Sequence, residues 1–248
     1  MKFTGLILAV SLTLATSLHA EEVALHGAVT AVDILITPNK EAIEKATGLT
    51  LSVMGNSAGK GLSDLADGKC DGCLAAGDIK STVDAAKKNG KEVDPAKLQF
   101  TQLLTDEIVF FVNPANPVKK LSTAQVKGIL TGKITNWKDV GGNDAPIVVV
   151  SEVATGATRG AIKALALDNE DYVATTKTQP TIKQVASLVA EFKNGIGGAS
   201  SKIIGANKVQ VLETDRKLER PLGIITLGTP SEKVKKVIDA IAAEVKGK

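Results

Sequence analysis

Two short loops rich in glycine and hydroxyl residues have the composition of anion-binding sites. Residues 55–61, with the sequence GNSAGKG, precede a predicted helix, and residues 155–159, with the sequence TGATR, follow a β-branched stretch. The N-terminus of a helix exposes unpaired N–H groups and the positive end of the helix dipole, and small residues let an anion approach them. Neither loop is a P-loop, because the order Gly-x4-Gly-Lys-Ser/Thr is absent. The same composition also serves as an ordinary helix cap.

Histidine is too scarce to support catalysis or a histidine-rich metal site. The chain contains His19 and His26 alone, and His19 falls in the N-terminal apolar segment. A Ser-His-Asp or Cys-His group would have to use His26, which stands beside Gly27 with no partnered nucleophile in view. His26 is therefore interpreted as a strand-end residue. We predict a protein that is not an enzyme and that uses neither a metal nor a cofactor.

The first 20 residues have the layout of a cleavable secretory signal peptide. Lys2 provides the positive charge, residues 6–18 are uncharged and mostly apolar, and Ala20 is a small residue followed by Glu21. The apolar stretch is shorter than the roughly 20 residues of a membrane span, and an uncleaved anchor is the alternative. We expect cleavage near Ala20 and a periplasmic or secreted protein.

The composition excludes several classes of partner. The formal net charge is +3, and it falls to +2 without Lys2, so nucleic-acid binding is not indicated. Hydrophobic residues make up 44% of the chain, which is enough for a core, whereas aromatic residues make up 3%, which argues against a sugar site built on stacked rings. The lysines at positions 87–97 are interpreted as a solvated face.

Predicted strands alternate with predicted helices along the chain, which favours an α/β fold with mostly parallel sheets. Ser122 and Gln125 form a capping-box pattern at one helix start, and Thr229 and Glu232 form another that includes Pro230 at the first helical position. The predicted strands are residues 22–25, 49–53, 71–76, 107–112, 147–150, 209–212 and 222–227, and the predicted helices lie within 28–47 and at 62–67, 122–130, 155–167 and beyond 229.

A long central motif carries a family resemblance. Residues 112–117 read VNPANP, residues 129–142 read ILTGKITNWKDVGG, and Arg220 opens a later Arg-Pro-Leu sequence. These segments resemble the phosphate-binding proteins of bacterial ABC importers, and the match spans nearly the whole chain after residue 20. The order of the flanking strands and loops is also similar to that family.

The resemblance implies a type II periplasmic-binding-protein fold, with two α/β lobes that close on a ligand through a hinge. The expected division is residues 1–20 as signal peptide, residues 21–108 plus 212–248 as lobe 1, and residues 109–211 as lobe 2. The implied function is capture of a small oxyanion, phosphate first, for an ABC permease in the membrane. A monomer is expected.

The resemblance also places the ligand site. The implied ligand-binding residues are Ala28, Val29, Thr30, Ser57, Asp78, Gly156, Thr158 and Arg159. Asp78, with Asp71 as the second choice, would accept the proton of phosphate. The chain departs from the family in that Ala28 and Val29 stand where hydroxyl residues are typical, and the serine of the Ser-Gly-Thr-Arg loop is missing. Each lost donor weakens binding by roughly 1–3 kcal/mol. The alternative is therefore a non-transport binding or sensor module of the same fold with a different ligand.

Cys70 and Cys73 form a C-x-x-C pair outside the family motif. In an oxidising compartment such a pair can form a disulfide, which is the prediction adopted here. Two buried free thiols and a redox-active pair are the alternatives. No histidine follows the pair, so haem attachment is not indicated, and zinc lacks further ligands.

Overall fold

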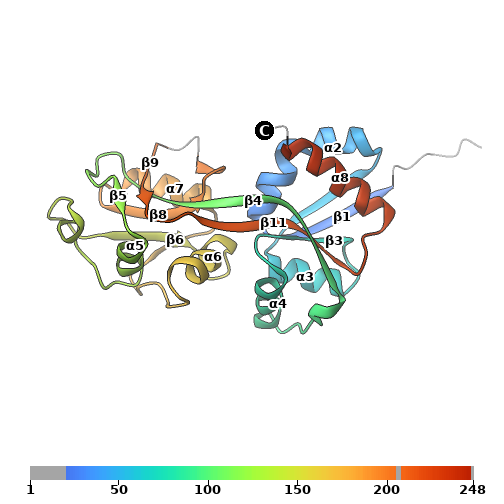
Figure 1. The fold of residues 1–248 in the computed structure, drawn as a ribbon, viewed down its shortest axis with the longest axis horizontal. Coiled ribbons are helices and arrows are strands. Elements are labelled where there is room, and N and C mark those ends of the chain that lie inside the picture. Colours follow the sequence, from blue (N-terminus) through green and yellow to red (C-terminus); the bar gives the residue numbers. More distant parts are fainter. Residues whose placement is uncertain (1–20, 205–207, 247–248) are drawn as a thin grey trace, which may run out of the picture.

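Two lobes of mixed α/β structure lie side by side in the computed structural model, joined by two long strands (Figure 1). The structure describes residues 21–204 and 208–246, so the predicted signal peptide lies outside the described residues. In this described part, none of the helices is both long enough and apolar enough to cross a bilayer. Lobe 1 holds the N-terminal strands and the last helix, and lobe 2 holds the middle of the chain.

The elements follow the predicted alternation with wider bounds. The strands are β1 (Glu22–Gly27), β2 (Thr50–Gly55), β3 (Gly72–Ala75), β4 (Leu98–Val112), β5 (Lys120–Leu121), β6 (Val148–Glu152), β7 (Lys177–Gln179), β8 (Gly195–Ser200), β9 (Gln210–Val211), β10 (Glu213–Thr214) and β11 (Leu218–Leu227). The helices are α1 (Val29–Ala31), α2 (Lys40–Thr47), α3 (Ala58–Ala66), α4 (Ile79–Lys88), α5 (Thr123–Leu130), α6 (Ala157–Ala166), α7 (Ile182–Glu191) and α8 (Glu232–Lys246). A π-helical turn (Val32–Ile36) and 3-10 turns (Thr37–Asn39, Pro95–Lys97, Trp137–Val140) complete them.

One sheet runs through both lobes in the order β2-β1-β3-β11-β4-β8-β6-β7. The outer strands of each lobe pair in parallel, β1 with β2 and β3, and β6 with β7 and β8. The connecting strands β4 and β11 instead run antiparallel to each other, from the Ile108–Leu218 pair to the Leu98–Leu227 pair. The predicted parallel pairing is therefore found in the outer strands, and the hinge strands make the sheet mixed.

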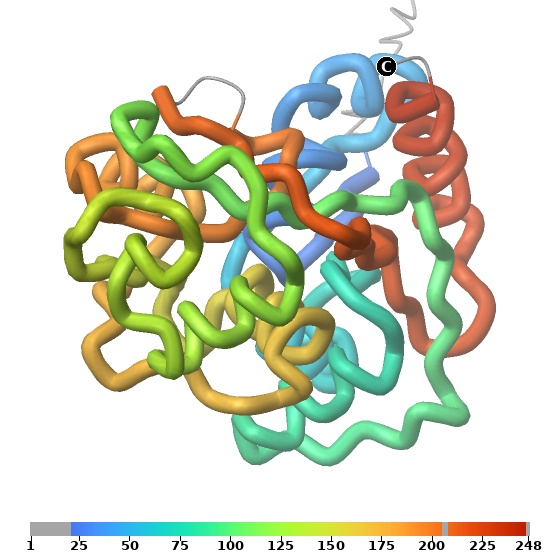
Figure 2. Tube along the Cα trace, turned by 60° about the vertical axis from the view of Figure 1, so that its left-hand side comes forward, coloured from blue at the N-terminus to red at the C-terminus, as the bar shows by residue number. Residues whose placement is uncertain are grey.

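Helices cover both faces of the sheet in each lobe. Neighbouring residues of a strand point to opposite faces, and apolar side chains on both faces pack against these helices. In lobe 1, Leu25 faces the core that includes α2 and α8, whereas Ala24 faces the core under α3 and α4. In lobe 2, Phe110 packs with α5 and α6, whereas Phe111 packs with α7. Figure 2 shows α8, the last helix, lying against the first helices of lobe 1.

The connecting strands contribute to the cores of both lobes. Leu222 and Ile224 of β11 pack in lobe 1, whereas Leu218 of the same strand packs in lobe 2, as does Leu212 before it. The chain thus passes between the lobes inside β4 and β11. The predicted domain boundaries at residues 108/109 and 211/212 stay a prediction.

The capping-box patterns in the sequence predicted the start of α5 correctly and the start of α8 less accurately. Helix α5 begins after Ser122, whose hydroxyl accepts from the Gln125 N–H at 3.1 Å while the Gln125 side chain accepts from the Ser122 N–H at 2.9 Å, so the capping box is confirmed. Helix α8 begins at Glu232, and the Ser231 hydroxyl accepts from the N–H of the third helical residue at 3.5 Å. The predicted start with Pro230 in the first helical position is therefore wrong by two residues.

The motif that carries the family resemblance fixes loops of lobe 2. The Asn113 side chain donates to the Ala190 carbonyl at 2.7 Å, and the Trp137 indole donates to the Asn194 carbonyl at 3.0 Å. Trp137 is almost completely buried. These hydrogen bonds tie the loops after β4 and α5 to the end of α7. The motif thus specifies the fold of lobe 2 through packing and backbone hydrogen bonds.

The predicted Cys70–Cys73 disulfide is wrong, because both thiols are free and buried. Each sulfur faces a different carbonyl of α3: Cys70 Sγ lies 3.8 Å from the Gly61 oxygen, and Cys73 Sγ lies 3.4 Å from the Ala58 oxygen. The two side chains are therefore seated about one helical turn apart rather than on each other. Burial raises the pKa of Cys70 to about 11 and raises the pKa of Cys73 further, so both remain thiols.

A close backbone approach places the first two predicted ligand loops together. Gly27 has φ of +150°, and a Cβ atom there would lie 2.1 Å from the Leu74 oxygen. A Cβ atom at Gly61 of α3 would lie 2.6 Å from the Gly27 Cα atom. Glycine is therefore required at both positions. In the same turn, the N–H groups of Asn56 and Ser57 donate to the Gly27 carbonyl at 2.9 and 3.1 Å.

Candidate functional site

The first and last predicted ligand loops meet where the lobes touch. Thr30 lies in α1 of lobe 1, and Thr158 lies in the first turn of α6 in lobe 2. Their Oγ1 atoms are 3.5 Å apart, and both side chains are buried. Ala157, next to Thr158, packs against the core of lobe 1. The structure thus brings together, from opposite lobes, two of the hydroxyl residues that were predicted to bind the ligand.

A buried arginine on the hinge strand joins this contact. Arg220 donates from Nη2 to Thr158 Oγ1 at 3.1 Å and from Nε to Asp106 Oδ2 at 3.0 Å. Arg220 is 3% exposed and Asp106 is 0% exposed. The other Asp106 oxygen accepts from the Ser200 hydroxyl at 2.5 Å. Asp106 and Arg220 are also paired residues of β4 and β11, so the hinge strands themselves hold this ion pair.

One nitrogen of Arg220 is left unpaired. Among the residues that the structure describes, Nη1 is buried with no hydrogen-bond partner. Burial lowers the pKa of Arg220 and the negative charges of Asp106 and Glu152 oppose this effect, and an arginine side chain stays charged in proteins. A buried N–H group without an acceptor is costly, so this nitrogen offers a ligand acceptor a favourable partner.

The N-terminus of α6 is occupied by a carboxylate of the chain itself. Glu152 ends β6, and its Oε2 accepts from the backbone N–H groups of Thr158 at 2.9 Å and Arg159 at 3.3 Å. Glu152 is 8% exposed. A Cβ atom at Gly156 would lie 2.8 Å from this Oε2, so glycine leaves the space that the carboxylate uses. Burial raises the pKa of Glu152, against the two N–H donors and the charge of Arg220, which lower it.

Arg159 is held within lobe 2. Its Nη1 donates to the Glu152 carbonyl oxygen at 3.2 Å, and its guanidinium lies over the Tyr172 ring, 4.1 Å from the ring centre. Such a cation–π contact stabilises the side chain in this orientation. The role of Arg159 as a ligand donor stays a prediction, as do the roles of the other residues that the sequence nominated.

Ser57 and Asp78 both serve as helix caps. The Ser57 hydroxyl accepts from the Lys60 N–H at 3.3 Å, and Ser57 has the unusual φ of +133°. The Asp78 carboxylate accepts from the Ser81 N–H at 2.8 Å, which lowers the pKa of Asp78. Asp78 is exposed, and its contacts lie on its own helix rather than at Thr30 and Thr158.

Two more of the residues predicted to bind the ligand, Ala28 and Val29, come directly before Thr30 in the chain. Ala28 is buried, and its N–H donates to the Leu74 carbonyl at 2.8 Å. Val29 is 41% exposed and lies near Gly55, where a Cβ atom would be 3.3 Å from the valine Cγ2. The first turn therefore offers an apolar surface where the related family has hydroxyls.

His26 and Asp71 have structural contacts. His26 Nδ1 lies 2.8 Å from Asp64 Oδ2, and His26 lies near the end of β1, as predicted. The Asp71 carboxylate accepts from the Ala24 N–H at 2.8 Å and pairs with Lys233 at 2.9 Å. In the described ranges 21–204 and 208–246, no group of three metal-ligating side chains is found.

A second contact connects the lobes away from Thr30. Lys183 of α7 pairs with Asp33 of the π-helical turn at 3.5 Å, and Ile203 packs against the cores of both lobes. The lysine side chain is 66% exposed, so the ion pair adds little stability in solvent.

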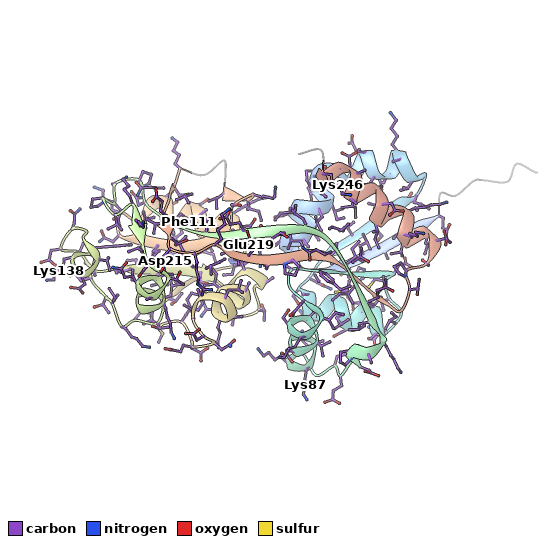
Figure 3. The ribbon with its side chains drawn as sticks, in the orientation of Figure 1. Lys87, Phe111, Lys138, Asp215, Glu219 and Lys246 are labelled. Carbon is purple, nitrogen blue, oxygen red and sulfur yellow. The ribbon has the colours of Figure 1, made fainter. Side chains whose placement is uncertain are left out.

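Sequence reasoning missed Glu152, Asp106 and Arg220 as site residues. Each is a charged residue in a strand that also supplies apolar residues to a core, and a buried charge needs a partner. That pattern could have identified them. Asp106 and Arg220 are far from each other in sequence, however, since 114 positions separate them. Figure 3 shows Glu219, the neighbour of Arg220, on the strands that cross between the lobes.

Residues 20–244 match the PBP superfamily domain. The chain is 28% identical over 182 residues to the phosphate-binding protein PstS of Bacillus subtilis, covering 73% of this chain and 58% of that protein, so it spans less than two thirds of that relative. A putative phosphate ABC transporter substrate-binding protein from Clostridium perfringens, solved with bound phosphate, has 27% identity and a TM-score of 0.76 over 89% of this chain and 93% of that chain.

An ABC-type phosphate transport receptor from Vibrio cholerae has the same fold, with 22% identity and a TM-score of 0.72 over 91% of this chain and 96% of that chain. These relatives are named as binding proteins and receptors, in agreement with the prediction of a non-enzymatic protein. The chain belongs to the PBP superfamily and has its type II fold of two α/β lobes.

Proposed function

We propose that this protein is an extracytoplasmic solute-binding protein that captures a small oxyanion between its lobes for uptake by an ABC permease. Phosphate is the first candidate, because proteins with a similar fold include an ABC-type phosphate transport receptor and a putative substrate-binding protein solved with bound phosphate. The observation that carries the proposal is the meeting of Thr30 and Thr158 from opposite lobes beside the unpaired Nη1 of buried Arg220. Closure of two lobes around a ligand needs such donors on both sides.

A different ligand in the same place is the second candidate. It is favoured by the Glu152 carboxylate, which already accepts the N–H groups at the N-terminus of α6. It is also favoured by Ala28 and Val29, which supply no side-chain donors. On this reading the protein is a binding or sensor module whose solute carries less negative charge than the phosphate dianion.

Isothermal titration of the purified protein with inorganic phosphate, sulfate and small carboxylates separates these candidates. For phosphate capture we expect one binding site per chain and weaker binding of phosphate to Thr30→Val and Thr158→Val, by about tenfold each. Thr50→Val, at the exposed start of β2, is the matched control and should bind like the wild type. Saturable binding of a carboxylate, with no heat from phosphate or sulfate, would favour the second candidate and contradict phosphate capture.

Export is tested by fractionating bacterial cells that express the full chain. We expect the protein outside the cytoplasm with Glu21 as its first residue, because Ala20 completes the cleavage pattern. A chain that keeps residues 1–20 and stays in the membrane fraction would contradict the expected cleavage. Co-purification with a permease is the corresponding test of the transport partner.

A further inference from the structure

The carboxylate of Glu152 occupies the position in which an external anion was expected. The sequence TGATR at the start of α6 has the composition of an anion-binding loop, yet its backbone N–H groups at Thr158 and Arg159 donate to Glu152 Oε2. An anion at this helix N-terminus would have to displace that carboxylate or lie beside it. Either arrangement is opposed by the negative charge of Glu152.

A second observation shows that the same place is still suited to a ligand. Arg220 reaches Thr158 with Nη2, and its Nη1 is buried without a partner in the described part of the chain. The guanidinium also feels the charge of Glu152, which stabilises its protonated form. An acceptor atom of a ligand would therefore satisfy Arg220, next to a carboxylate that repels further negative charge.

The buried charges of the site already balance. Arg220 is paired with Asp106, and Glu152 faces the two N–H groups of α6 with the Arg159 side chain bonded to its own carbonyl. A singly charged ligand adds one negative charge to this buried arrangement, whereas a doubly charged ligand adds two. The cost of a buried charge without a partner rises steeply with its size.

We propose that Glu152 is a specificity-determining residue, which holds the α6 N-terminus with its own carboxylate and so selects singly charged oxyanions over doubly charged ones. This proposal rests on the proposed function, because it requires a solute that binds between the lobes. Glu152 acts through charge and through the N–H groups that it occupies. Gly156 supports it by leaving room for the carboxylate.

The test compares wild type, Glu152→Gln and Glu152→Ala by titration with inorganic phosphate and sulfate. In mildly acidic buffer phosphate carries mainly one negative charge and sulfate carries two, and both are tetrahedral. The wild type should prefer phosphate. Both variants should bind sulfate about tenfold or more tightly than the wild type and lose much of the preference, since the repelling charge is gone.

The matched control is Glu219→Gln, which removes the same charge next to Arg220 but from the exposed face of β11. It should bind sulfate and phosphate like the wild type. Circular dichroism and cooperative thermal unfolding establish that each variant is folded. The wild-type preference between the two anions tests the proposal even where a variant fails to fold.

The outcomes separate this proposal from the proposed function. If the wild type binds phosphate and sulfate equally, or if the folded variants gain no sulfate affinity, the role of Glu152 is overturned while phosphate capture stands. If the variants bind sulfate and the wild type binds neither anion, the role of Glu152 stands and phosphate as the natural ligand falls. Absence of binding by all the chains overturns both.

Discussion

Thr30 and Thr158 lie 128 residues apart in the sequence, yet their hydroxyl oxygens are 3.5 Å apart at the junction of the lobes. This contact joins a turn after β1 to the first turn of α6, and Arg220 of the hinge strand donates to one of the pair. The three residues come from lobe 1, lobe 2 and their connection. A change in the angle between the lobes must therefore change this contact, which makes it a suitable place for a ligand to control closure.

The buried pair of Arg220 and Asp106 is expected to stabilise the hinge. Arg220→Ala leaves the fully buried Asp106 carboxylate without its ion-pair partner, and the free energy of unfolding should fall by about 3–5 kcal/mol. Urea unfolding followed by circular dichroism measures this change. Lys217→Ala, one residue before the same strand, is the control, because its side chain is 73% exposed and its loss should change stability by less than about 0.5 kcal/mol.

A loss below about 1 kcal/mol for Arg220→Ala would contradict this account of the hinge. The Asp106→Asn and Arg220→Ala double variant gives a further check. If the two residues act as a pair, the double variant should be less destabilised than the sum of the single variants.

Short sequence patterns correctly predicted the structural features that depend on interactions between neighbouring residues. The capping box at Ser122 identified the start of α5, because both of its hydrogen bonds lie within four residues. The motif at residues 129–142 identified the family and with it the two-lobed fold. By contrast, β4 begins at Leu98, nine residues before its predicted start, because the strand is fixed by pairing with β11 rather than by its own mixed sequence.

The candidate site was predicted mainly from the family resemblance. The resemblance pointed to Thr30 and Thr158, and the fold brings these two residues together, while their role in ligand binding stays a prediction. Asp78 was also proposed from the resemblance, and in the structure its carboxylate caps a helix. Glu152 was missed because its partners are backbone N–H groups at the start of α6. Every residue has a backbone N–H group, so the sequence does not show that the Glu152 side chain points toward these two.

The two cysteines should be unreactive in the native protein. Both thiols are buried, and the raised pKa of Cys70, about 11, leaves little thiolate at neutral pH. We expect negligible labelling by a thiol reagent in buffer and two labelled thiols per chain after unfolding in guanidinium, without any reductant. Labelling that requires a reductant would instead reveal a disulfide in the native protein.

The stability of the protein should depend on pH through Glu152. Burial raises the pKa of Glu152 above its ordinary value, so the folded state binds the proton more tightly than the unfolded state. Stability contributed by the protonated form is therefore lost as pH rises from the unfolded pKa through the raised folded pKa, and it is constant above that window. The charge of Arg220 lowers the pKa of this carboxylate against the effect of burial, and the Arg159 guanidinium bonds to the Glu152 backbone carbonyl oxygen.

Glu152→Gln removes this titration without a large change in shape. We expect the free energy of unfolding of the variant minus that of the wild type to increase with pH across this window, in a urea series at fixed ionic strength. Glu219→Gln, on the exposed face of β11, keeps Glu152 and is the matched control for loss of one carboxylate. A difference for Glu152→Gln that is flat with pH would contradict the raised pKa.

A crystal structure of the protein grown with inorganic phosphate tests the central claim, capture of a small oxyanion between the lobes, most directly. We expect one phosphate between the lobes, with an oxygen within hydrogen-bond distance of Arg220 Nη1 and of the Thr30 hydroxyl, and with Glu152 beside it. Phosphate bound elsewhere on the molecule, or Arg220 Nη1 satisfied by another residue of the chain with the lobes in contact, would contradict it.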